Sequence, residues 1–313
     1  MQPVGHSANI RMASRANQRI MMINRGPSDQ GFIVCQDCGA AMPGDRGDVL
    51  RIKGKEVGRP YRSKYAQTPC RHYDTVNVNL GYDFVTDMLV LEFALDSNQI
   101  DTRQGAENLW LNRAAHSLSE ALRLAASKEL DVEFTELVTG YRLRKNARGF
   151  FVDLYLYDNL SSGAGYAVGV ARGIETLLKR TEALLQNCDC ESACHSCLKH
   201  YRNQFAHGML DRFAGLDLLN WGIHGYKAAE LPLENQMALL SPLIRILDRA
   251  GYHVQLDRDE IFVSSQKQKK GIVVYPAMWT EPVQSDRIYV SDACLKYAKP
   301  YAVQRVLDFF LSI

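Results

Sequence analysis

Four of the eight cysteines in this 313-residue chain fall within ten consecutive residues. Cys188, Cys190, Cys194 and Cys197 form the pattern C-x-C-x3-C-x2-C. Thiolates are soft donors, and four of them match the closed tetrahedral shell of a structural zinc ion. A disulfide between Cys188 and Cys190 would close too small a ring for normal geometry. The spacing therefore predicts a structural Zn²⁺ site with no open position for a catalytic water. Reduced thiols, or a redox or iron–sulfur role, are the alternatives.

The composition is that of an ordinary globular chain, with 46% hydrophobic and 23% charged residues. This length suits one large domain or two modest ones. No apolar run approaches the roughly 18 residues of a membrane span, and residues 1–25 are too polar for a secretory signal. We therefore expect a cytoplasmic protein without membrane association.

The positive charge is concentrated in the first quarter of the chain. Residues 1–72 carry twelve Lys and Arg against five Asp and Glu, whereas the whole chain has a net charge of only +2. A basic N-terminal quarter predicts that contact with a polyanion lies at this end. The alternative is an exposed, solvated segment that favours Arg.

A second metal site is predicted inside this basic quarter. Residues 32–39 predict a strand that leads into a C-x2-C-G turn with Cys35 and Cys38, which is typical of the first half of a zinc ribbon. Cys70 and His72 are the nearest soft ligands that would complete it. The alternative is a pair of reduced cysteines and an exposed histidine. Between the two pairs, a loop or hairpin carries candidate DNA-binding side chains: Arg51, Lys53, Lys55, Arg59, Arg62 and Lys64.

The hydrophobic pattern predicts a mixed α+β fold in three parts. Residues 1–74 are a basic segment with the zinc-ribbon-like site, and residues 1–30 within it show no sustained period and are expected to be irregular. Residues 75–230 form an α/β core, and residues 231–313 form a small α/β lobe.

The core and the lobe each have a predicted order of elements. For the core we expect two strands around Gly81 within 77–95, a long helix over 107–130, strands over 131–144 and 149–157, and helices over 164–186, 194–207 and 210–222. For the lobe we expect a helix over 234–250, strands near 252–264, 271–275 and 287–290, and a helix over 292–311 that contains Pro300.

Signals for catalysis are weak. No phosphate-binding G-x-x-x-x-G-K-[ST] loop occurs, so ATP hydrolysis by this chain alone is not expected. A metal-dependent nuclease would recruit strand-associated carboxylates. The candidates are Asp87, Glu92, Asp153 and Asp158. Because nothing in the sequence fixes their mutual geometry, solvent-facing or turn-capping acids are the favoured interpretation, and no catalytic residue is assigned.

The segment after the cysteines carries a row of polar residues that includes Lys199 and Arg202. Such a row either follows a phosphate backbone or forms the polar face of a packed helix. The glycine-rich stretch 158–169 matches a dinucleotide-binding turn poorly, and a structural turn is the favoured interpretation.

The motifs around the cysteine cluster occur in a particular order. Leu154-Tyr155-Leu156-Tyr157-Asp158 and Gly163-Ala164-Gly165-Tyr166 precede it; Leu198, Asn203-Gln204, Leu210-Asp211-Arg212 and Leu218-Leu219 follow it. In this order they resemble the Mrf zinc-binding (MZB) domain over approximately residues 75–222. That domain occurs at the C-terminus of Mrf-type superfamily 2 helicases and in helicase-associated proteins of phage-defence operons such as the DISARM partner subunit. The resemblance implies zinc on the four clustered cysteines and brings no catalytic residues.

The predicted function is that of a non-catalytic, zinc-containing, helicase-associated module. It would bind DNA, dock a superfamily 2 helicase subunit or domain, or do both, in DNA repair or phage defence. One Zn²⁺ is predicted at the cysteine cluster and a second at the zinc-ribbon-like site. A metal-dependent nuclease and a purely protein-binding scaffold are the alternatives.

Overall fold

The computed structural model describes the chain except for residues 27–28, 45–47, 53–54, 60–73, 104, 106–107, 267, 284–285 and 312–313. It is a mixed α+β protein, as the sequence predicts. The chain divides into two compact units: residues 17–86 form one, and residues 1–16 together with 87–313 form the other. The predicted boundaries after residues 74 and 230 stay a prediction. None of the described helices combines the length and apolarity needed to cross a membrane.

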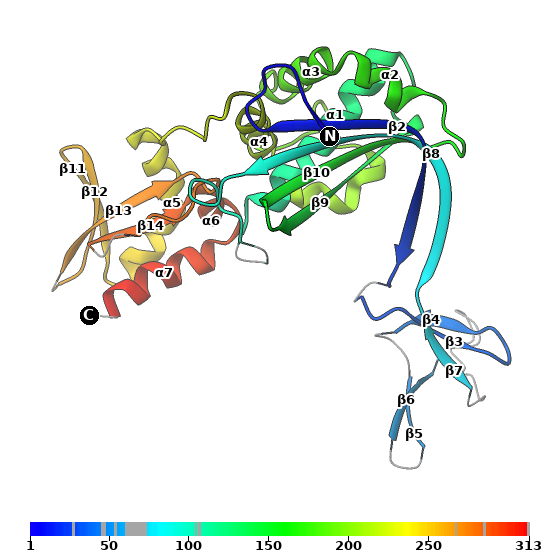
Figure 1. Cartoon of the computed structure of the whole chain (residues 1–313). Coiled ribbons are helices and arrows are strands. Elements are labelled where there is room, and N and C mark those ends of the chain that lie inside the picture. Colours follow the sequence, from blue (N-terminus) through cyan, green and yellow to red (C-terminus); the bar gives the residue numbers. More distant parts are fainter. Residues whose placement is uncertain are drawn as a thin grey trace. The chain divides into compact units, whose positions relative to one another are not determined.

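The larger unit is built on a five-stranded sheet (Figure 1). In spatial order its strands are β1 (Gln2–Pro3), β2 (Ile10–Asn24), β8 (Leu80–Leu95), β10 (Gly149–Asp158) and β9 (Leu137–Asn146). Strand β10 pairs with both β8 and β9 in antiparallel register. From Asp87 to Leu95, alternate side chains of β8 are buried, as expected for a strand with one face against a core.

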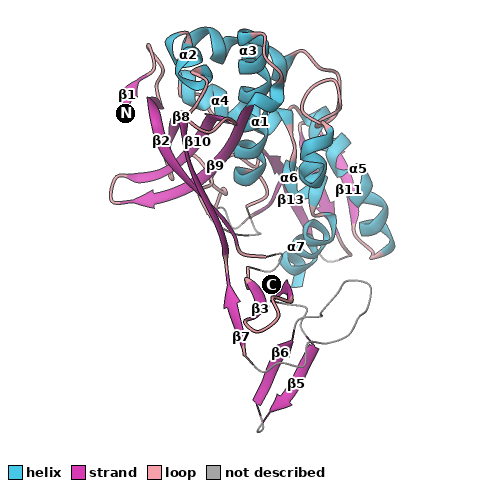
Figure 2. Ribbon diagram, turned by 90° about the vertical axis from the view of Figure 1, so that its right-hand side faces the viewer, coloured by secondary structure: helices cyan, strands magenta, loops and turns pink. Residues whose placement is uncertain are grey.

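Helices cover one face of this sheet (Figure 2). They are α1 (Leu111–Leu130), α2 (Tyr166–Arg172), α3 (Ile174–Gln186) and α4 (Arg212–His224), with a 3₁₀ segment η2 (Tyr201–Met209) before α4. Helix α1 contacts β9 and β10 and also contacts α3 and α4. It is therefore buried on nearly all sides, and even Glu120 and Arg123 of this helix are inaccessible.

The C-terminal part of the larger unit has its own sheet and core. A helix, α5 (Leu233–Arg249), precedes a four-stranded sheet of β11 (His253–Asp257), β12 (Glu260–Ser264), β13 (Lys269–Tyr275) and β14 (Arg287–Ser291), and α6 (Asp292–Tyr297) and α7 (Lys299–Leu311) follow. Strands β13 and β14 are parallel. Tyr297 Oη donates to Asp211 Oδ2 over 2.7 Å, and Trp279 Nε1 donates to the Ala228 carbonyl over 2.8 Å. These bonds attach the lobe to the cysteine-containing part.

The smaller unit contains a three-stranded sheet and a hairpin. Its strands are β3 (Phe32–Cys35), β4 (Ala41–Pro43) and β7 (Thr75–Val78) in the sheet, and β5 (Asp48–Ile52) and β6 (Lys55–Arg59) in the hairpin. The predicted strand into the C-x2-C-G turn is confirmed. Gly39 has φ of +68°, which favours glycine, and its N–H donates to the Cys35 carbonyl.

The expectation that residues 1–30 are irregular is wrong, because β2 is a 15-residue strand. Only its beginning lies against the core, where Ile10 and Met12 are buried. Most of the side chains farther along β2 are exposed, so the strand lacks the apolar alternation that would identify it. Its neighbour β8 lies far away in the sequence, and the pairing is invisible to a local pattern.

Several predicted elements have different boundaries. Gly81 lies inside β8, and the break falls at Asn79, with β7 paired to β3 instead. The helix expected over 164–186 is interrupted at Gly173. The helix expected over 292–311 is also two helices, and Pro300 stands in the first turn of α7, where its missing N–H costs no hydrogen bond. The helix expected over 194–207 is instead a set of turns followed by η2.

Gly222 allows α4 to approach the sheet closely. A Cβ atom at this position would lie 2.5 Å from the Phe93 ring and 2.6 Å from the Ile10 side chain. Both neighbours are fully buried, so neither can move aside cheaply. We predict that Gly222→Ala lowers the free energy of unfolding by about 1–3 kcal/mol, although alanine is the better helix former.

The matched control for this substitution is Gly169→Ala in α2. A Cβ there would meet only Leu130, at an ordinary contact distance of 3.8 Å. Urea unfolding followed by circular dichroism should show no loss of stability for this variant. Equal behaviour of the two variants would contradict the close packing of α4.

Candidate metal centre

The four clustered cysteine sulfurs meet at one point. The Sγ atoms all lie within 4.8 Å of one another. The Sγ–Sγ distances are 3.6 Å for Cys188–Cys194, 3.7 Å for Cys190–Cys197 and 3.8 Å for Cys194–Cys197. Four thiolates around a zinc ion at about 2.3 Å give a tetrahedron with edges of about 3.8 Å. The donor set and its geometry therefore fit a single Zn²⁺ ion.

The cluster is built on a short stretch between α3 and α4 that has no helix or strand of its own. The Cys194 N–H donates to Cys197 Sγ over 3.2 Å, and the N–H groups of Leu198 and Lys199 donate to the Cys194 carbonyl. These bonds wrap the backbone around the sulfurs of the C-x2-C pair. Such a turn offers N–H groups to sulfur and so favours the charged thiolate that a metal requires.

The thiols differ in acidity. The backbone N–H of Ser196 is the main cause that lowers the pKa of Cys194 to about 6. Burial raises the pKa of Cys197 to about 12, and burial also raises that of Cys190. A divalent cation at the centre of the four sulfurs would deprotonate a coordinating thiol outright. Burial of several thiolates together is therefore favourable only with such an ion present.

Arg212 fixes the cluster to the helices on either side. Its buried guanidinium donates from Nε to the Cys190 carbonyl over 3.0 Å and from Nη1 to the Leu185 carbonyl over 2.9 Å. Its own N–H donates to the Ser192 carbonyl. One side chain at the start of α4 thus satisfies carbonyls at the end of α3 and inside the cysteine loop.

A buried ionic group connects the cluster to α1. Glu120 Oε2 lies 2.7 Å from Arg123 Nη2 and 3.0 Å from His200 Nε2. His200 follows Cys197 by three residues, and its ring also packs against Phe134 at 4.9 Å. Removing Glu120 or Arg123 would leave the charge of the other buried and uncompensated, so these two side chains stabilise the arrangement only as a pair.

The structure tests the second predicted metal site only in part. Cys35 is buried and Cys38 is exposed, on the turn after β3. Backbone pairing sets Thr75 of β7 opposite Cys35. The other two predicted ligands, Cys70 and His72, lie outside the described residues. This site therefore stays a prediction.

Only some of the predicted DNA-binding residues lie in the part of the chain that the structure describes. Lys53, Arg62 and Lys64 lie outside the described residues, and for those in the β5–β6 hairpin the structure describes the backbone only. The hairpin residues are Arg51, Lys55 and Arg59. Near the cysteines, Lys199 is half-buried and Arg202 is exposed.

Two of the strand carboxylates belong to a cross-strand ion-pair ladder. Asp153 is 2% exposed and lies 2.9 Å from both Arg142 and Arg144. Arg144 also pairs with Glu92, the residue opposite Asp153 in the sheet. These guanidinium groups occupy the carboxylate oxygens that a catalytic metal would need, so the ladder stabilises the sheet.

The other two carboxylates hold the glycine-rich turn before α2. Asp158 accepts from the N–H groups of Ala164, Tyr166 and Ala167, and Asp87 accepts from the Gly165 N–H. The turn-capping interpretation is thus confirmed for this pair. Among the described residues, the four cysteines are the one group of three or more His, Cys, Asp or Glu side chains that lie close enough together to share a metal ion.

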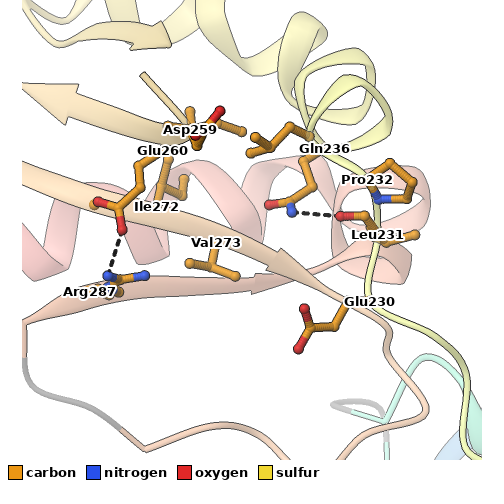
Figure 3. Close-up of a pocket in the computed structure, with 12 residues that line it drawn as sticks. Glu230, Leu231, Pro232, Gln236, Asp259, Glu260, Ile272, Val273 and Arg287 are labelled. Atoms are coloured by element: carbon orange, nitrogen blue, oxygen red, sulfur yellow. Dashed lines mark hydrogen bonds and ion pairs between the residues drawn. The ribbon is translucent and has the colours of Figure 1, made fainter. Parts of the chain in front are cut away.

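The C-terminal lobe holds a pocket of about 450 Å³ (Figure 3). Glu260 at its edge pairs with Arg287 over 2.8 Å. Gln236 donates to the Leu231 carbonyl and accepts from the Val274 N–H. These polar groups are therefore engaged within the lobe, and Glu230 and Asp259 are further acidic residues that line the pocket.

Arg212 is a functional residue that sequence reasoning did not single out. It was visible only as one letter of the Leu210-Asp211-Arg212 motif. We predict that Arg212→Ala lowers the free energy of unfolding by about 3 kcal/mol, because carbonyls of α3 and the cysteine loop lose a charged donor.

Urea denaturation checks this prediction, with Arg245→Ala as the control. Arg245 lies exposed on α5 and its removal should change stability by less than about 0.5 kcal/mol. Similar stabilities for the two variants would mean that the guanidinium contributes nothing to the cluster.

The comparisons with known proteins agree with the site. Residues 118–198 match the family model of the MrfA Zn-binding domain, MZB. The chain is 32% identical over 298 residues to Druantia protein DruE of Escherichia coli (strain UMEA 4076-1), which covers 91% of this chain but 16% of that protein. It thus spans less than a fifth of the length of this relative.

Two crystal structures of the DUF1998 helicase MrfA are also similar. The one bound to DNA has a TM-score of 0.39 at 13% identity over 68% of this chain and 26% of that chain. The one bound to DNA and AMPPNP has a TM-score of 0.32 at 13% identity over 69% of this chain and 23% of that chain. Scores of this size are too low to establish a shared fold. The family match instead confirms the predicted resemblance: residues 118–198, up to and including the cysteine cluster, match the MZB (MrfA Zn-binding) domain.

Proposed function

We propose that this chain is a non-catalytic, zinc-containing module that binds DNA and docks a superfamily 2 helicase motor in phage defence. The observation that carries the proposal is the meeting of four cysteine sulfurs, with edges of 3.6–3.8 Å, inside the part of the chain that matches the MrfA Zn-binding domain. Four protein ligands close the shell of the ion, so the zinc would hold structure and activate no water.

The charge next to the cluster supports DNA as the ligand. From residue 199 to residue 210 the chain has Lys199 and Arg202 and no acidic residue. Arg202 is exposed at the surface. Phosphate contacts from such side chains supply affinity without sequence preference. The basic N-terminal quarter would supply phosphate contacts of its own.

The motor would lie outside these residues. The sequence has no phosphate-binding loop of the Walker type, so unwinding would need ATPase domains elsewhere. The relative DruE is a Druantia protein, which favours defence over repair as the setting. The match of residues 118–198 to the MrfA Zn-binding domain supports a helicase as the partner.

Metal content tests the zinc part of the proposal. Mass spectrometry of the purified protein should find zinc, and Cys194→Ser should lose one ion per chain together with stability, because three thiolates no longer close the shell. Cys294→Ser is the control, since this buried thiol belongs to α6 and to neither of the two predicted metal sites. Zinc that is unchanged in Cys194→Ser would refute the site.

The same measurement on Cys35→Ser examines the second predicted site. Loss of a further ion would support a zinc ribbon completed by Cys70 and His72. An unchanged zinc content would confine the metal to the MZB cluster.

DNA binding is tested by fluorescence anisotropy with short oligonucleotides at several salt concentrations. We predict salt-sensitive binding, and we predict that Lys199→Glu with Arg202→Glu reduces the salt slope by roughly 1–2, because two phosphate contacts are lost. The control pair Arg245→Glu with Lys299→Glu makes the same change in net charge on exposed faces of α5 and α7. No measurable DNA affinity of the unaltered protein at low salt would favour the protein-binding scaffold instead.

A further inference from the structure

Two aromatic rings on η2 stand almost entirely in solvent. Tyr201 is 81% exposed and Phe205 is 96% exposed. Single exposed apolar side chains are common in proteins. Here, however, two large rings project from one nine-residue segment directly after the cysteine cluster.

The segment that carries these rings is fixed from within. Asn203 is buried, and its side chain donates to the Leu198 carbonyl over 2.9 Å and accepts from the His200 N–H over 2.9 Å. His207 Nε2 lies 2.9 Å from the same Asn203 oxygen. One amide thus joins both halves of η2 to the end of the cysteine loop.

Helix α1 holds both ends of η2 from outside. At the start, His200 contacts the buried Glu120, and near the end Arg113 donates to the Gly208 carbonyl. The exposed rings therefore project from an ordered frame and do not belong to a loose loop. An ordered frame keeps the entropic cost of binding at these rings low.

The charge of the residues near these rings indicates which kind of ligand binds there. Lys199 and Arg202 lie within two residues of Tyr201 in the sequence, Arg202 is exposed, and no acidic residue occurs from 199 to 210. A polyanion with accessible apolar faces fits this combination. Single-stranded nucleic acid is such a ligand, because unpaired bases stack on aromatic side chains while basic side chains follow the phosphates. A duplex hides the faces of its bases in the stack.

We propose that η2 is a stacking platform for unpaired DNA bases, with Tyr201 and Phe205 as the stacking rings and Lys199 and Arg202 at the phosphates. This inference rests on the proposed DNA-binding function and adds a preference for single strands. In this arrangement the cysteine cluster is the rigid base that holds the start of η2 in place.

The test compares oligo-dT with a hairpin duplex of similar charge by fluorescence anisotropy at fixed low salt. Tyr201→Ala and Phe205→Ala should each weaken single-strand binding roughly 5- to 150-fold, which corresponds to one lost base stack. Duplex binding should change less than about twofold, and the salt slope should stay constant because no phosphate contact is removed. Tyr226→Ala, another exposed tyrosine at 71%, is the matched control and should bind as the unaltered protein does.

Phe205→Trp adds a readout that a general loss of structure cannot imitate. Tryptophan keeps the stacking surface, so affinity should be retained and its fluorescence should be quenched by oligo-dT. Zinc content and thermal unfolding of all variants should equal those of the unaltered protein, because the replaced rings are exposed. DNA binding that is equal for both strand forms and indifferent to these rings would overturn the platform but leave the proposed function standing. Absence of all DNA binding would overturn both.

Discussion

The meeting of four sulfur atoms is the constraint on which the centre of this protein depends. Between the end of α3 and the start of η2 the chain forms no helix and no strand. A stretch of this kind supplies few backbone hydrogen bonds of its own, and an ion bound by the four sulfurs would take over the role of holding it. With the loop fixed, Arg212 can reach the carbonyls of Leu185 and Cys190 at once. That contact ties the start of α4 to the end of α3.

The polar groups around the cluster extend this order into the helical layer. Glu120 and Arg123 are charged residues inside a helix that is buried on nearly all sides, and each would be costly there alone. His200, delivered by the cysteine loop, contacts both Glu120 and Arg123. A stable α1 and a well-formed cysteine loop therefore require each other. The exposed rings of η2 therefore project from a segment that is itself held in place by hydrogen bonds.

The strand carboxylates that a nuclease would recruit have structural roles in this protein. A nuclease needs carboxylates that converge on an ion with oxygens to spare. Asp153 instead lies between two guanidinium groups, and Asp158 accepts three backbone N–H groups at the turn before α2. Both side chains are almost inaccessible. Their oxygens are already bonded to arginines in the sheet and to backbone N–H groups in the turn.

Local sequence determined the elements whose signal lies within a few residues. The cysteine spacing predicted a four-sulfur site because ligands this close in sequence must be close in space, and the apolar period over 107–130 predicted α1 because a buried helix repeats its contacts every turn. The strands β9 and β10 followed from alternation and a short connection in the same way.

The tertiary structure alone decided what depends on partners far along the chain. Strand β2 pairs beside β8, more than fifty residues later, so nothing local marked it as a strand. The helix expected after Cys194 is a set of turns and η2, in which the Asn203 side chain bonds the His200 N–H and the Leu198 carbonyl in competition with regular helical bonds. The sequence determined which four cysteines share one site. Only the folded chain decided that Asp153 pairs with arginines of the sheet and that Phe205 faces water, since burial and ion pairing depend on neighbours in space.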